Sequence, residues 1–353
     1  METSRKIRVL IIDDSAIVRR TLSEIVNSHP DLEVAGTAAD PFIARDKILA
    51  LKPDVLTLDI EMPRMDGLTF LKKLMRFHPI PVVIISSLCQ SSSRAAIEAL
   101  QFGAVDVIAK PNGPYSVTDL RDQLALKIRT AAQARLRHER AAPPEPARCS
   151  RDHGPVQLIA IGASTGGVEA LRSVLVELPQ DMPPIVIVQH IPAVFSAEFA
   201  ARLDRLCRLR VKEAEDGDAV EPGSALIAPG GFHLSIRKSG GRFRAAVHGG
   251  DPVHYQRPAV DVLFDSVARS AGREAIGAIL TGMGADGAAG LLAMKQAGAR
   301  TIAQNEASCV VFGMPREAIR LGGVDEILPL AGIAPELIRL ASGSVRHAPQ
   351  ALP

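Results

Sequence analysis

Five short apolar runs alternate with amphipathic stretches between Ile7 and about Arg129, and this alternation limits the possible folds more than any other feature of the chain. Each run has the length of one β-strand, and the stretches between the runs have helical spacing. Strands separated by helices form βαβ units, in which the strands are parallel and the crossovers right-handed. The apolar runs are Ile7–Ile12, Leu32–Thr37, Val55–Leu58, Val82–Ile85 and Val105–Ala109. We therefore expect a doubly wound α/β domain whose sites lie at the carboxyl ends of the strands.

A second region with the same alternation begins at residue 156 and indicates a separate domain. Its strand-like runs are Val156–Ile161, Ile185–Val188, Ala225–Ala228, Ala275–Leu280 and Arg300–Ala303. The length of 353 residues suits two domains, at about 150 residues for each. Aromatic residues make up 3% of the chain, so Ala, Val, Ile and Leu must fill the cores, as is typical of parallel sheets covered by helices. We predict an α/β fold with a doubly wound N-terminal domain (1–128), a proline-rich linker (129–155), a mainly parallel C-terminal α/β domain (156–342) and a disordered tail (343–353).

Charge and apolar patterning exclude several classes of protein. The formal net charge is +2, and no basic stripe with aromatic partners stands out, so we expect no nucleic-acid binding. No run approaches the ~18 apolar residues that span a bilayer, and we expect no membrane insertion. The N-terminus lacks a signal-peptide pattern, and the four Cys form no CxxC pair, which suits free thiols in a reducing cytosol. These features predict a cytoplasmic enzyme or regulator.

Acidic residues follow two strands of the first domain: Asp13 and Asp14 follow the first, and Asp59 follows the third. In a doubly wound sheet these strand ends converge. Crowded carboxylates repel one another unless a cation lies between them, and oxygen ligands favour a hard ion such as Mg²⁺. Ser86 follows the fourth run and Lys110 the fifth, so a hydroxyl and an ammonium group reach the same place. These two groups would suit the oxygens of a phosphoryl group.

The first domain resembles the receiver domain of response regulators from residue 7 to about 128. The segment Leu58–Gly67 is especially close to the phosphoacceptor loop of that family. The resemblance implies that Asp59 accepts a phosphoryl group from the phosphohistidine of a sensor histidine kinase. It also implies that Ser86 bonds a phosphoryl oxygen and that Lys110 pairs with it.

The same resemblance implies a metal site and shows one departure from the family. Asp14, Asp59 and the backbone carbonyl of Glu61 would hold Mg²⁺, with Asp13 assisting through water. Many receivers carry an aromatic residue three places before the lysine, where its rotation reports phosphorylation. Val107 stands at that position. An aromatic switch is therefore not expected, and the signal must travel by other shifts.

A glycine-rich turn, Gly162–Gly167, follows the first strand of the second domain and precedes a helical run. Such a turn can hold a phosphate at the helix N-terminus, but a dinucleotide fingerprint requires glycine where Ser164 stands. A Walker A loop would need a Gly-Lys-Ser/Thr ending, which is missing. The GxSxG pattern instead resembles a nucleophile elbow, in which small neighbours expose the serine hydroxyl. The motif alone leaves a nucleophile and a simple tight turn as alternatives.

A serine nucleophile needs a base, and the base needs a group that fixes its tautomer. His190 follows the next candidate strand, so it is expected beside Ser164. Asp286 lies in a third glycine-rich loop that also follows a strand, where free backbone amides could donate to an oxyanion. The order Ser, His, Asp along the chain differs from the orders of three well-known serine hydrolase folds, but a triad is recognised by geometry.

Residues 156 to about 340 resemble the catalytic domain of the chemotaxis protein-glutamate methylesterases, the CheB family. The matching segments are Ile161–Gly167, Val188–Pro192, Ala228–His233, Arg257–Asp261, Leu280–Gly287 and Phe312–Pro315. The resemblance implies that Ser164 attacks the γ-carbonyl of a methylated glutamate on a methyl-accepting chemoreceptor, with His190 as general base and Asp286 orienting it. The backbone amide of Met283 would stabilise the oxyanion. Deamidation of receptor glutamines is implied as a second activity, and no cofactor is implied for the ester chemistry.

Two alternatives remain beside this phosphorylation-activated hydrolase. One is a response regulator with a non-catalytic binding output, and the other is a nucleotide-binding enzyme that uses the Gly162–Gly167 turn. Three further residues have simpler interpretations: His233 could line the substrate groove, His248 is expected in a loop, and Asp261 is expected only to begin a helix. In the family that the chain resembles, the unphosphorylated receiver covers the active site, and we expect the same control here.

Overall fold

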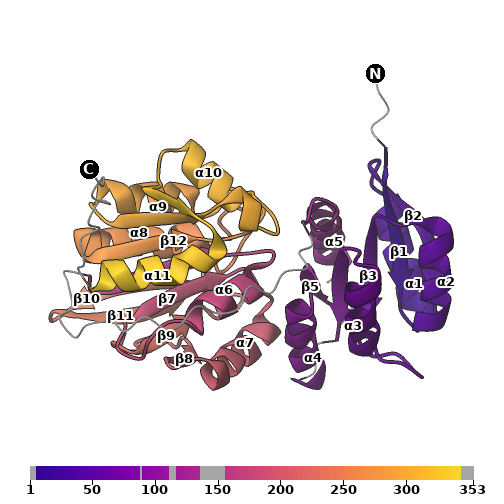
Figure 1. Cartoon of the computed structure of the whole chain (residues 1–353), viewed down its shortest axis with the longest axis horizontal. Helices are drawn as coiled ribbons and strands as arrows, with labels where there is room; N and C mark the ends of the chain where they lie inside the picture. Colours follow the sequence, from indigo (N-terminus) through magenta and orange to yellow (C-terminus); the bar gives the residue numbers. More distant parts are fainter. Residues whose placement is uncertain (1–4, 88–89, 111–116, 136–155, 343–353) are drawn as a thin grey trace, which may run out of the picture. The chain divides into compact units, whose positions relative to one another are not determined.

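The structure is a computed structural model that describes residues 5–87, 90–110, 117–135 and 156–342. It divides into two compact units, Met1–Glu139 and Arg140–Pro353 (Figure 1). Each unit holds its own mostly parallel sheet with helices, which confirms the predicted α/β fold class. The predicted linker starts inside a helix that continues to Ala132. The rest of the linker from residue 136 and the predicted tail lie outside the described residues.

The first unit contains a five-stranded parallel sheet in the order β2-β1-β3-β4-β5. Its strands are β1 (Ile7–Ile12), β2 (Leu32–Ala38), β3 (Val55–Asp59), β4 (Val82–Ser86) and β5 (Asp106–Ala109). Its helices are α1 (Ala16–Asn27), α2 (Pro41–Leu51), α3 (Gly67–Phe77), α4 (Gln90–Gln101) and α5 (Val117–Ala132). The strand order reverses between β1 and β3, which is the place where doubly wound sheets carry their sites.

Short polar side chains begin three of these helices directly after the loops that follow the strands. Ser15 accepts a hydrogen bond from the backbone of α1, Asp40 caps α2, and Asp66 caps α3. Such N-caps satisfy backbone N–H groups that have no partner within the helix. Gly67 starts α3 where a Cβ atom would lie 2.0 Å from the carbonyl oxygen of Asp59. The loop after β3 can therefore fold back tightly only because this residue is glycine.

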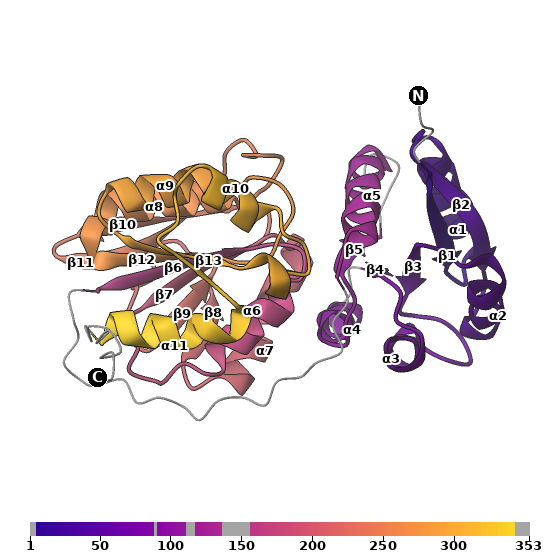
Figure 2. The ribbon, with the colours of Figure 1, turned by 45° about the horizontal axis from the view of Figure 1, so that its top comes forward.

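The second unit contains a seven-stranded parallel sheet in the order β14-β13-β12-β6-β7-β9-β8. Figure 2 labels its strands β6, β7, β8, β9, β12 and β13. Its strands are β6 (Leu158–Ala163), β7 (Ile185–Gln189), β8 (Arg210–Glu213), β9 (Ser224–Ile227), β12 (Ala275–Ile279), β13 (Arg300–Gln304) and β14 (Glu326–Leu328). Its helices are α6 (Gly167–Leu175), α7 (Ala193–Leu206), α8 (Val260–Ala271), α9 (Ala288–Gln296), α10 (Met314–Arg320) and α11 (Leu330–Ala341), with short 3-10 turns at Gly272–Glu274 and Glu306–Ser308. The central strands β6, β7 and β12 are buried along their whole length, as expected of a sheet with helices on both faces.

An antiparallel hairpin of β10 (His233–Ser239) and β11 (Arg242–His248) stands outside this sheet and packs on α8. The N–H of Ile236 donates to Ser266 Oγ at 2.9 Å, and Ser270 Oγ donates to the carbonyl of Ile236 at 2.8 Å. Two helix hydroxyls thus bond to the backbone of β10. The loop that leads from the hairpin into α8 reaches the loop after β12, because the N–H of Val260 at the start of α8 donates to Asp286.

The strand predictions were right for the centre of each sheet and incomplete at the edges. All ten predicted runs are strands, within two residues at either end. The edge strands β8 and β14 and the hairpin β10–β11 were not predicted from the sequence. Edge strands are short and mixed in polarity, because one side or one face meets water, and they lack the apolar run on which the prediction depended.

Candidate active site and phosphoacceptor site

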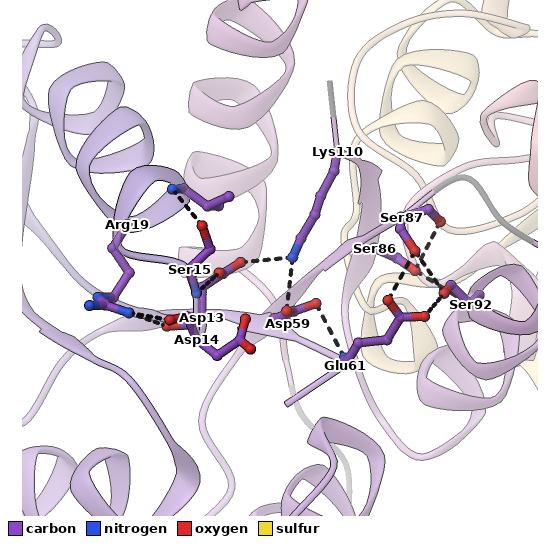
Figure 3. A network of polar contacts seen from close by, with 11 residues as sticks. Asp13, Asp14, Ser15, Arg19, Asp59, Glu61, Ser86, Ser87, Ser92 and Lys110 are labelled. Carbon is purple, nitrogen blue, oxygen red and sulfur yellow. Dashed lines mark hydrogen bonds and ion pairs between the residues drawn. The ribbon is translucent and has the colours of Figure 1, made fainter. Parts of the chain in front are cut away.

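Three carboxylates meet at the carboxyl ends of β1 and β3 (Figure 3). Asp13 and Asp14 follow β1, Asp59 ends β3, and one oxygen from each lies within 4.8 Å of the others. Asp13 and Asp59 are each 1% exposed, whereas Asp14 is exposed. The structure therefore brings the three predicted acidic residues together. Hard oxygen donors at this spacing suit a Mg²⁺ ion that keeps some of its water.

Lys110, which follows β5, reaches across to the same carboxylates. Its Nζ lies 2.8 Å from Asp59 Oδ2 and 3.0 Å from Asp13 Oδ2 (Figure 3). Burial favours the neutral acid and raises the pKa of Asp59 above its ordinary value, although Lys110 acts in the opposite direction. Burial also disfavours charge on Lys110, but the ion pairs with Asp59 and Asp13 outweigh it and raise the pKa of Lys110. The ammonium of Lys110 offsets only part of the negative charge of the clustered carboxylates, and the charge that remains suits a cation.

Ser86 ends β4, paired with the residue before Lys110, and its Oγ donates to the carbonyl oxygen of Ser92 at 3.3 Å. The neighbouring hydroxyls point elsewhere: Ser87 and Ser92 both donate to the carboxylate of Glu61 (Figure 3). Glu61 was predicted only as the source of a backbone carbonyl ligand. The network of its side chain with the start of α4 was not foreseen, because converging strand ends bring the two loops near each other without indicating which of their side chains meet.

Ser164 lies directly after β6, on the turn into α6, and its backbone is fixed from several directions. Its N–H donates to the carbonyl of Thr281 at 3.0 Å. Its carbonyl accepts from the N–H of Gly167 at 2.7 Å and from Gln189 Nε2 at 2.8 Å. Gly166 has φ 77°, in the left-handed region that disfavours side chains. The structure therefore shows a sharp strand-to-helix turn with the serine half-buried at its apex, a geometry that fits the nucleophile elbow, one of the two alternatives left open by the motif.

Gly282 brings the loop after β12 against this elbow. A Cβ atom on Gly282 would lie 2.6 Å from Ser164 Cβ and 2.3 Å from Met314 Sδ. The N–H of Gly282 donates to the carbonyl of Val311 at 3.0 Å, so the loop is held in place. The next N–H, that of Met283, donates to no acceptor in the part of the chain that the structure describes. A backbone donor therefore lies one residue from the glycine that contacts the serine.

His190 and Asp286 form a buried pair in the same region. The N–H of His190 donates to the carbonyl of Ala163 at 3.1 Å, which places the histidine beside the residue that precedes Ser164. Its Nε2 lies 2.7 Å from Asp286 Oδ2. The carboxylate of Asp286 also accepts backbone N–H groups from Val260 at 2.7 Å and from Asp261 at 2.9 Å. The fold thus brings the backbone of His190 to the residue before Ser164 and the carboxylate of Asp286 to the ring of His190.

The electrostatics of this pair suit a base that is held in one tautomer. Burial disfavours ionisation of Asp286, but hydrogen bonds from His190 and from the two amides outweigh it and lower the pKa of Asp286. An ionised Asp286 accepts the proton on Nε2, which leaves Nδ1 of His190 with its lone pair. Nδ1 is buried and has no hydrogen-bond partner among the described residues. It is the free basic atom of the site.

Asp261 contacts the active site more closely than the sequence indicated. It begins α8, as expected, but its N–H bonds to Asp286 and its own carboxylate is also buried, with 7% exposed. Asp261 Oδ1 accepts from the N–H of Gly290 in α9 at 2.6 Å, and Oδ2 lies 3.2 Å from His254 Nε2. Burial, with a smaller contribution from the charge of Asp286, raises the pKa of Asp261. In the sequence, only the place of Asp261 in the matching segment Arg257–Asp261 indicated a functional role. An acidic residue in the first turn of a helix is common and indicates no function by itself.

The two histidines of the hairpin, His233 and His248, make structural contacts. His233 is 2% exposed and its Nε2 bonds to the carbonyl of Asp251 at 3.0 Å. His248 lies in β11 rather than in the expected loop, because it pairs with His233 across the hairpin, and its Nε2 bonds to Ser235 Oγ at 2.8 Å. Both rings are occupied by these contacts, which leaves His190 as the base candidate.

Together, the fold and the two sites define a response regulator with a hydrolase-like output domain. A family model described as CheB methylesterase matches residues 159–337, and one described as response regulator receiver domain matches residues 9–121. The chain belongs to the CheB methylesterase family and carries an N-terminal receiver domain. Among the described residues, no helix has the length and apolar character needed to cross a membrane.

Relatives and solved structures agree with this assignment over most of the chain. The chain is 56% identical over 340 residues to protein-glutamate methylesterase/protein-glutamine glutaminase 2 of Syntrophus aciditrophicus, covering 95% of this chain and 99% of that protein. It is 53% identical to the protein-glutamate methylesterase/protein-glutamine glutaminase of Salmonella typhimurium, covering 94% and 96%. The crystal structure of the CheB methylesterase catalytic domain of Thermotoga maritima matches 52% of this chain and 98% of that one, with a TM-score of 0.52 and 42% identity. The match leaves the binding-only and nucleotide-binding alternatives without support.

Proposed function

We propose that this chain is a phosphorylation-controlled protein-glutamate methylesterase and protein-glutamine glutaminase in which Ser164 is the nucleophile. The observation that carries the proposal is the buried His190–Asp286 pair, joined at 2.7 Å and located beside the elbow of Ser164. The names of relatives more than 50% identical supply the substrate, a glutamate methyl ester or a glutamine in a protein. The receiver domain supplies the control.

The chemistry follows from the free nitrogen of the histidine. Nδ1 of His190 takes the proton of Ser164 Oγ while that oxygen attacks the γ-carbonyl carbon of the methylated glutamate. The negative charge that develops on the carbonyl oxygen is stabilised by the N–H of Met283. The protonated imidazole then gives its proton to the methoxy group, and methanol leaves an acyl-serine.

Water completes the cycle by the same route. His190 takes a proton from water, the hydroxide attacks the acyl carbon, and the proton returns to Ser164 Oγ as glutamate is released. With a glutamine substrate the leaving group is ammonia, and the second half of the reaction is unchanged. Asp286 stays ionised throughout, holds the proton on Nε2 and stabilises the imidazolium in both halves.

The receiver site has the groups that a phosphoacceptor needs. Asp59 is the proposed acceptor, and Asp13, Asp14, Asp59 and the backbone carbonyl of Glu61 would hold Mg²⁺, directly or through water. The ion, when bound, would neutralise charge on the carboxylates and on the phosphoryl oxygens. Lys110 would pair with one phosphoryl oxygen, and Ser86 would donate to another after giving up its bond to Ser92.

The proposed partners follow from the family. A sensor histidine kinase would donate the phosphoryl group to Asp59, and methyl-accepting chemoreceptors would be the substrates, in the cytoplasm. We assign the receiver to 1–128, the linker to 129–155 and the esterase to 156–342. We further propose that the unphosphorylated receiver restricts access to Ser164. Isolated residues 150–353 that hydrolysed receptor methyl esters no faster than the unphosphorylated full chain would contradict this control.

The test is methanol release from a methylated receptor fragment by the full chain, with and without a small-molecule phosphodonor and Mg²⁺. The Ser164→Ala variant should release no methanol. The phosphodonor should stimulate wild type but not Asp59→Asn. Methanol release by Ser164→Ala at the wild-type rate would remove the nucleophile assignment, and equal stimulation of Asp59→Asn would remove the phosphoacceptor assignment.

A further inference from the structure

The loop between β11 and α8 contains a tight turn in an unusual conformation. Val253 and Gln256 exchange both of their backbone hydrogen bonds, at 3.0 Å and 2.8 Å, and close a two-residue turn. The two central residues are His254 with φ 50° and Tyr255 with φ 62°. Such turns require two left-handed residues and strongly favour Asn-Gly. Non-glycine residues in this conformation persist where the surroundings hold them, and they cluster at functional sites.

The contacts that hold this turn lead to the catalytic carboxylate. His254 Nε2 lies 3.2 Å from Asp261 Oδ2, and the N–H of Asp261 donates to Asp286 Oδ1 at 2.9 Å. The turn is also tied to the loop before β10, because the N–H of Gly231 donates to the carbonyl of Arg257 at 3.0 Å. Its conformation is therefore fixed by the residues that border the active site.

The fixed turn presents an aromatic ring that buries nothing within the described residues. Tyr255 is 97% exposed, the highest value among the large exposed hydrophobic residues of the described chain. Phe232, next to Gly231 in the adjoining loop, is 50% exposed. That loop packs against the segment after His190, since a Cβ atom on Gly230 would lie 2.4 Å from the Cα of Ala193. Two exposed rings thus stand on two loops that are bonded to each other and that contact the neighbours of His190 and Asp286.

We propose that Tyr255 and Phe232 form an aromatic rim that binds the receptor polypeptide on either side of the modified glutamate. A protein substrate that places a side chain at Ser164 must lay its backbone across the loops that surround His190 and Asp286. Rigid aromatic side chains on such loops provide a large apolar contact at a small cost in conformational entropy. The rim therefore sets the affinity for the apolar side chains that flank the target residue. This inference rests on the proposed function, because it deepens the substrate recognition of the same site.

The experiment compares full chains that carry Tyr255→Ala, Phe232→Ala or both with wild type and with Leu206→Ala, in the presence of phosphodonor and Mg²⁺. Leu206 is a matched control, because it is 48% exposed in the same unit but ends α7, at the opposite end of that helix from His190. Steady-state methanol release from a methylated receptor fragment gives kcat and KM. The rate at which a small fluorophosphonate labels Ser164 measures the reactivity of this serine independently of contacts with the polypeptide substrate. Each variant is also measured without phosphodonor.

If the rim binds the receptor polypeptide, we expect KM for the receptor fragment to rise about fivefold to tenfold in each single variant and further in the double variant. We expect kcat to stay within about twofold of wild type. The labelling rate should be unchanged, and Leu206→Ala should match wild type throughout. A KM within twofold of wild type in the double variant would overturn the proposal. A parallel fall in kcat and labelling would also overturn it, because the turn would then act by positioning the catalytic groups. Increased methanol release by the unphosphorylated Tyr255→Ala chain, with KM unchanged, would assign the rim to the receiver instead.

Failure of the proposed function has a different signature from failure of the rim. If wild type itself releases no methanol from any methylated receptor fragment while Ser164 is labelled normally, the substrate class is wrong and the rim falls with it. If wild type releases methanol and the variants match it, only the rim is wrong.

Discussion

His190 turns Nε2, rather than Nδ1, toward Asp286, at a distance of 2.7 Å. Because the ionised Asp286 accepts the N–H at Nε2, the neutral ring keeps its lone pair on Nδ1, which has no partner within the described residues. The backbone amides of Val260 and Asp261 hold the carboxylate in this orientation. The orientation of one carboxylate thus decides which nitrogen of the base can take a proton from Ser164.

Replacing Asp286 by asparagine should therefore remove the tautomer control and leave the shape of the site nearly unchanged. We expect kcat for methanol release to fall by about 10³- to 10⁴-fold, with KM within a few-fold of wild type. The denaturant midpoint of the variant, followed by circular dichroism, serves as the folding control. A loss of less than tenfold in a well-folded variant would show that Asp286 does not orient the base.

The acid side of the pH profile of kcat/KM should reflect the protonation of a single group. The pKa of Asp286 is lowered below its ordinary value, so this carboxylate stays ionised at neutral pH and contributes no acid limb there. The ionised Asp286 stabilises the folded state fully at any pH above the pKa that this residue has in the unfolded chain. This stabilisation is lost only as the pH falls through the lower pKa of the folded state. We expect kcat/KM to fall no more steeply than tenfold per pH unit near neutrality, because Asp286 adds no second protonation there. A hundredfold loss per unit in wild type would contradict this.

Asp261 should act as a positioning residue for Asp286. The Asp261→Ala variant loses the bond to Gly290 and the contact with His254, so we expect kcat to fall about tenfold with KM unchanged. Asp261→Asn keeps an acceptor for Gly290 and should recover most of that loss. Comparison of kcat, KM and unfolding midpoint for both variants gives the test. Equal kcat losses in both variants would show that the negative charge, rather than the hydrogen bond, matters.

Gly282 should tolerate no side chain, because a Cβ atom there would lie 2.6 Å from Ser164 Cβ and 2.3 Å from Met314 Sδ. The Gly282→Ala variant must move the elbow or the loop that carries Met283. We expect fluorophosphonate labelling of Ser164 to slow by at least about tenfold and the free energy of unfolding to fall by about 1–3 kcal/mol. The solvent-facing Gly217→Ala is the control for a new methyl group, since nothing lies within 4 Å of its position, although its φ of 86° adds some strain. Labelling of Gly282→Ala at the wild-type rate would contradict the close approach.

The sequence predicted the parts of both sites that depend on strand ends. Asp59, Lys110 and His190 each stand at or just after the end of a mainly apolar strand, and parallel pairing brings the residues at such ends to the same edge of their sheet. The bond between Asp286 and Asp261 could not be predicted, because it depends on how α8 packs against α9. Packing between helices is set by the complementarity of many side chains, which no local pattern encodes.

The strained turn at Tyr255 was missed for a related reason. Its sequence contains no Asn-Gly or Asp-Gly pair, the signal on which turn prediction relies. The contact of His254 with Asp261 and the hydrogen bond from Gly231 to the carbonyl of Arg257 hold the left-handed conformation, and neither contact is visible in the local sequence. The network of Glu61 with Ser87 and Ser92 belongs to the same class, since two loops far apart in the chain must first come together.

Magnesium should stabilise the first unit through the carboxylates at the ends of β1 and β3. Burial raises the pKa of Asp59 despite the ion pair with Lys110, so a further cation would favour its ionised form, and one oxygen from each of Asp13, Asp14 and Asp59 lies within 4.8 Å of the others. At a Mg²⁺ concentration 100 times the Kd, we expect the free energy of unfolding of this unit to rise by about 2.7 kcal/mol. Calorimetry of the full chain with Mg²⁺ and then with excess chelator measures the change, and the transition of the second unit is the internal reference.

The variant Asp14→Asn should lose most of this stabilisation, because Asp14 is an exposed member of the cluster that Lys110 does not neutralise. Asp46→Asn is the matched control, since Asp46 is an exposed carboxylate of the same unit that pairs with Arg45 outside the cluster. The control should respond to Mg²⁺ as wild type does. An equal response of Asp14→Asn and wild type would place the ion elsewhere, because a carboxylate that binds Mg²⁺ cannot become an amide without weakening the site.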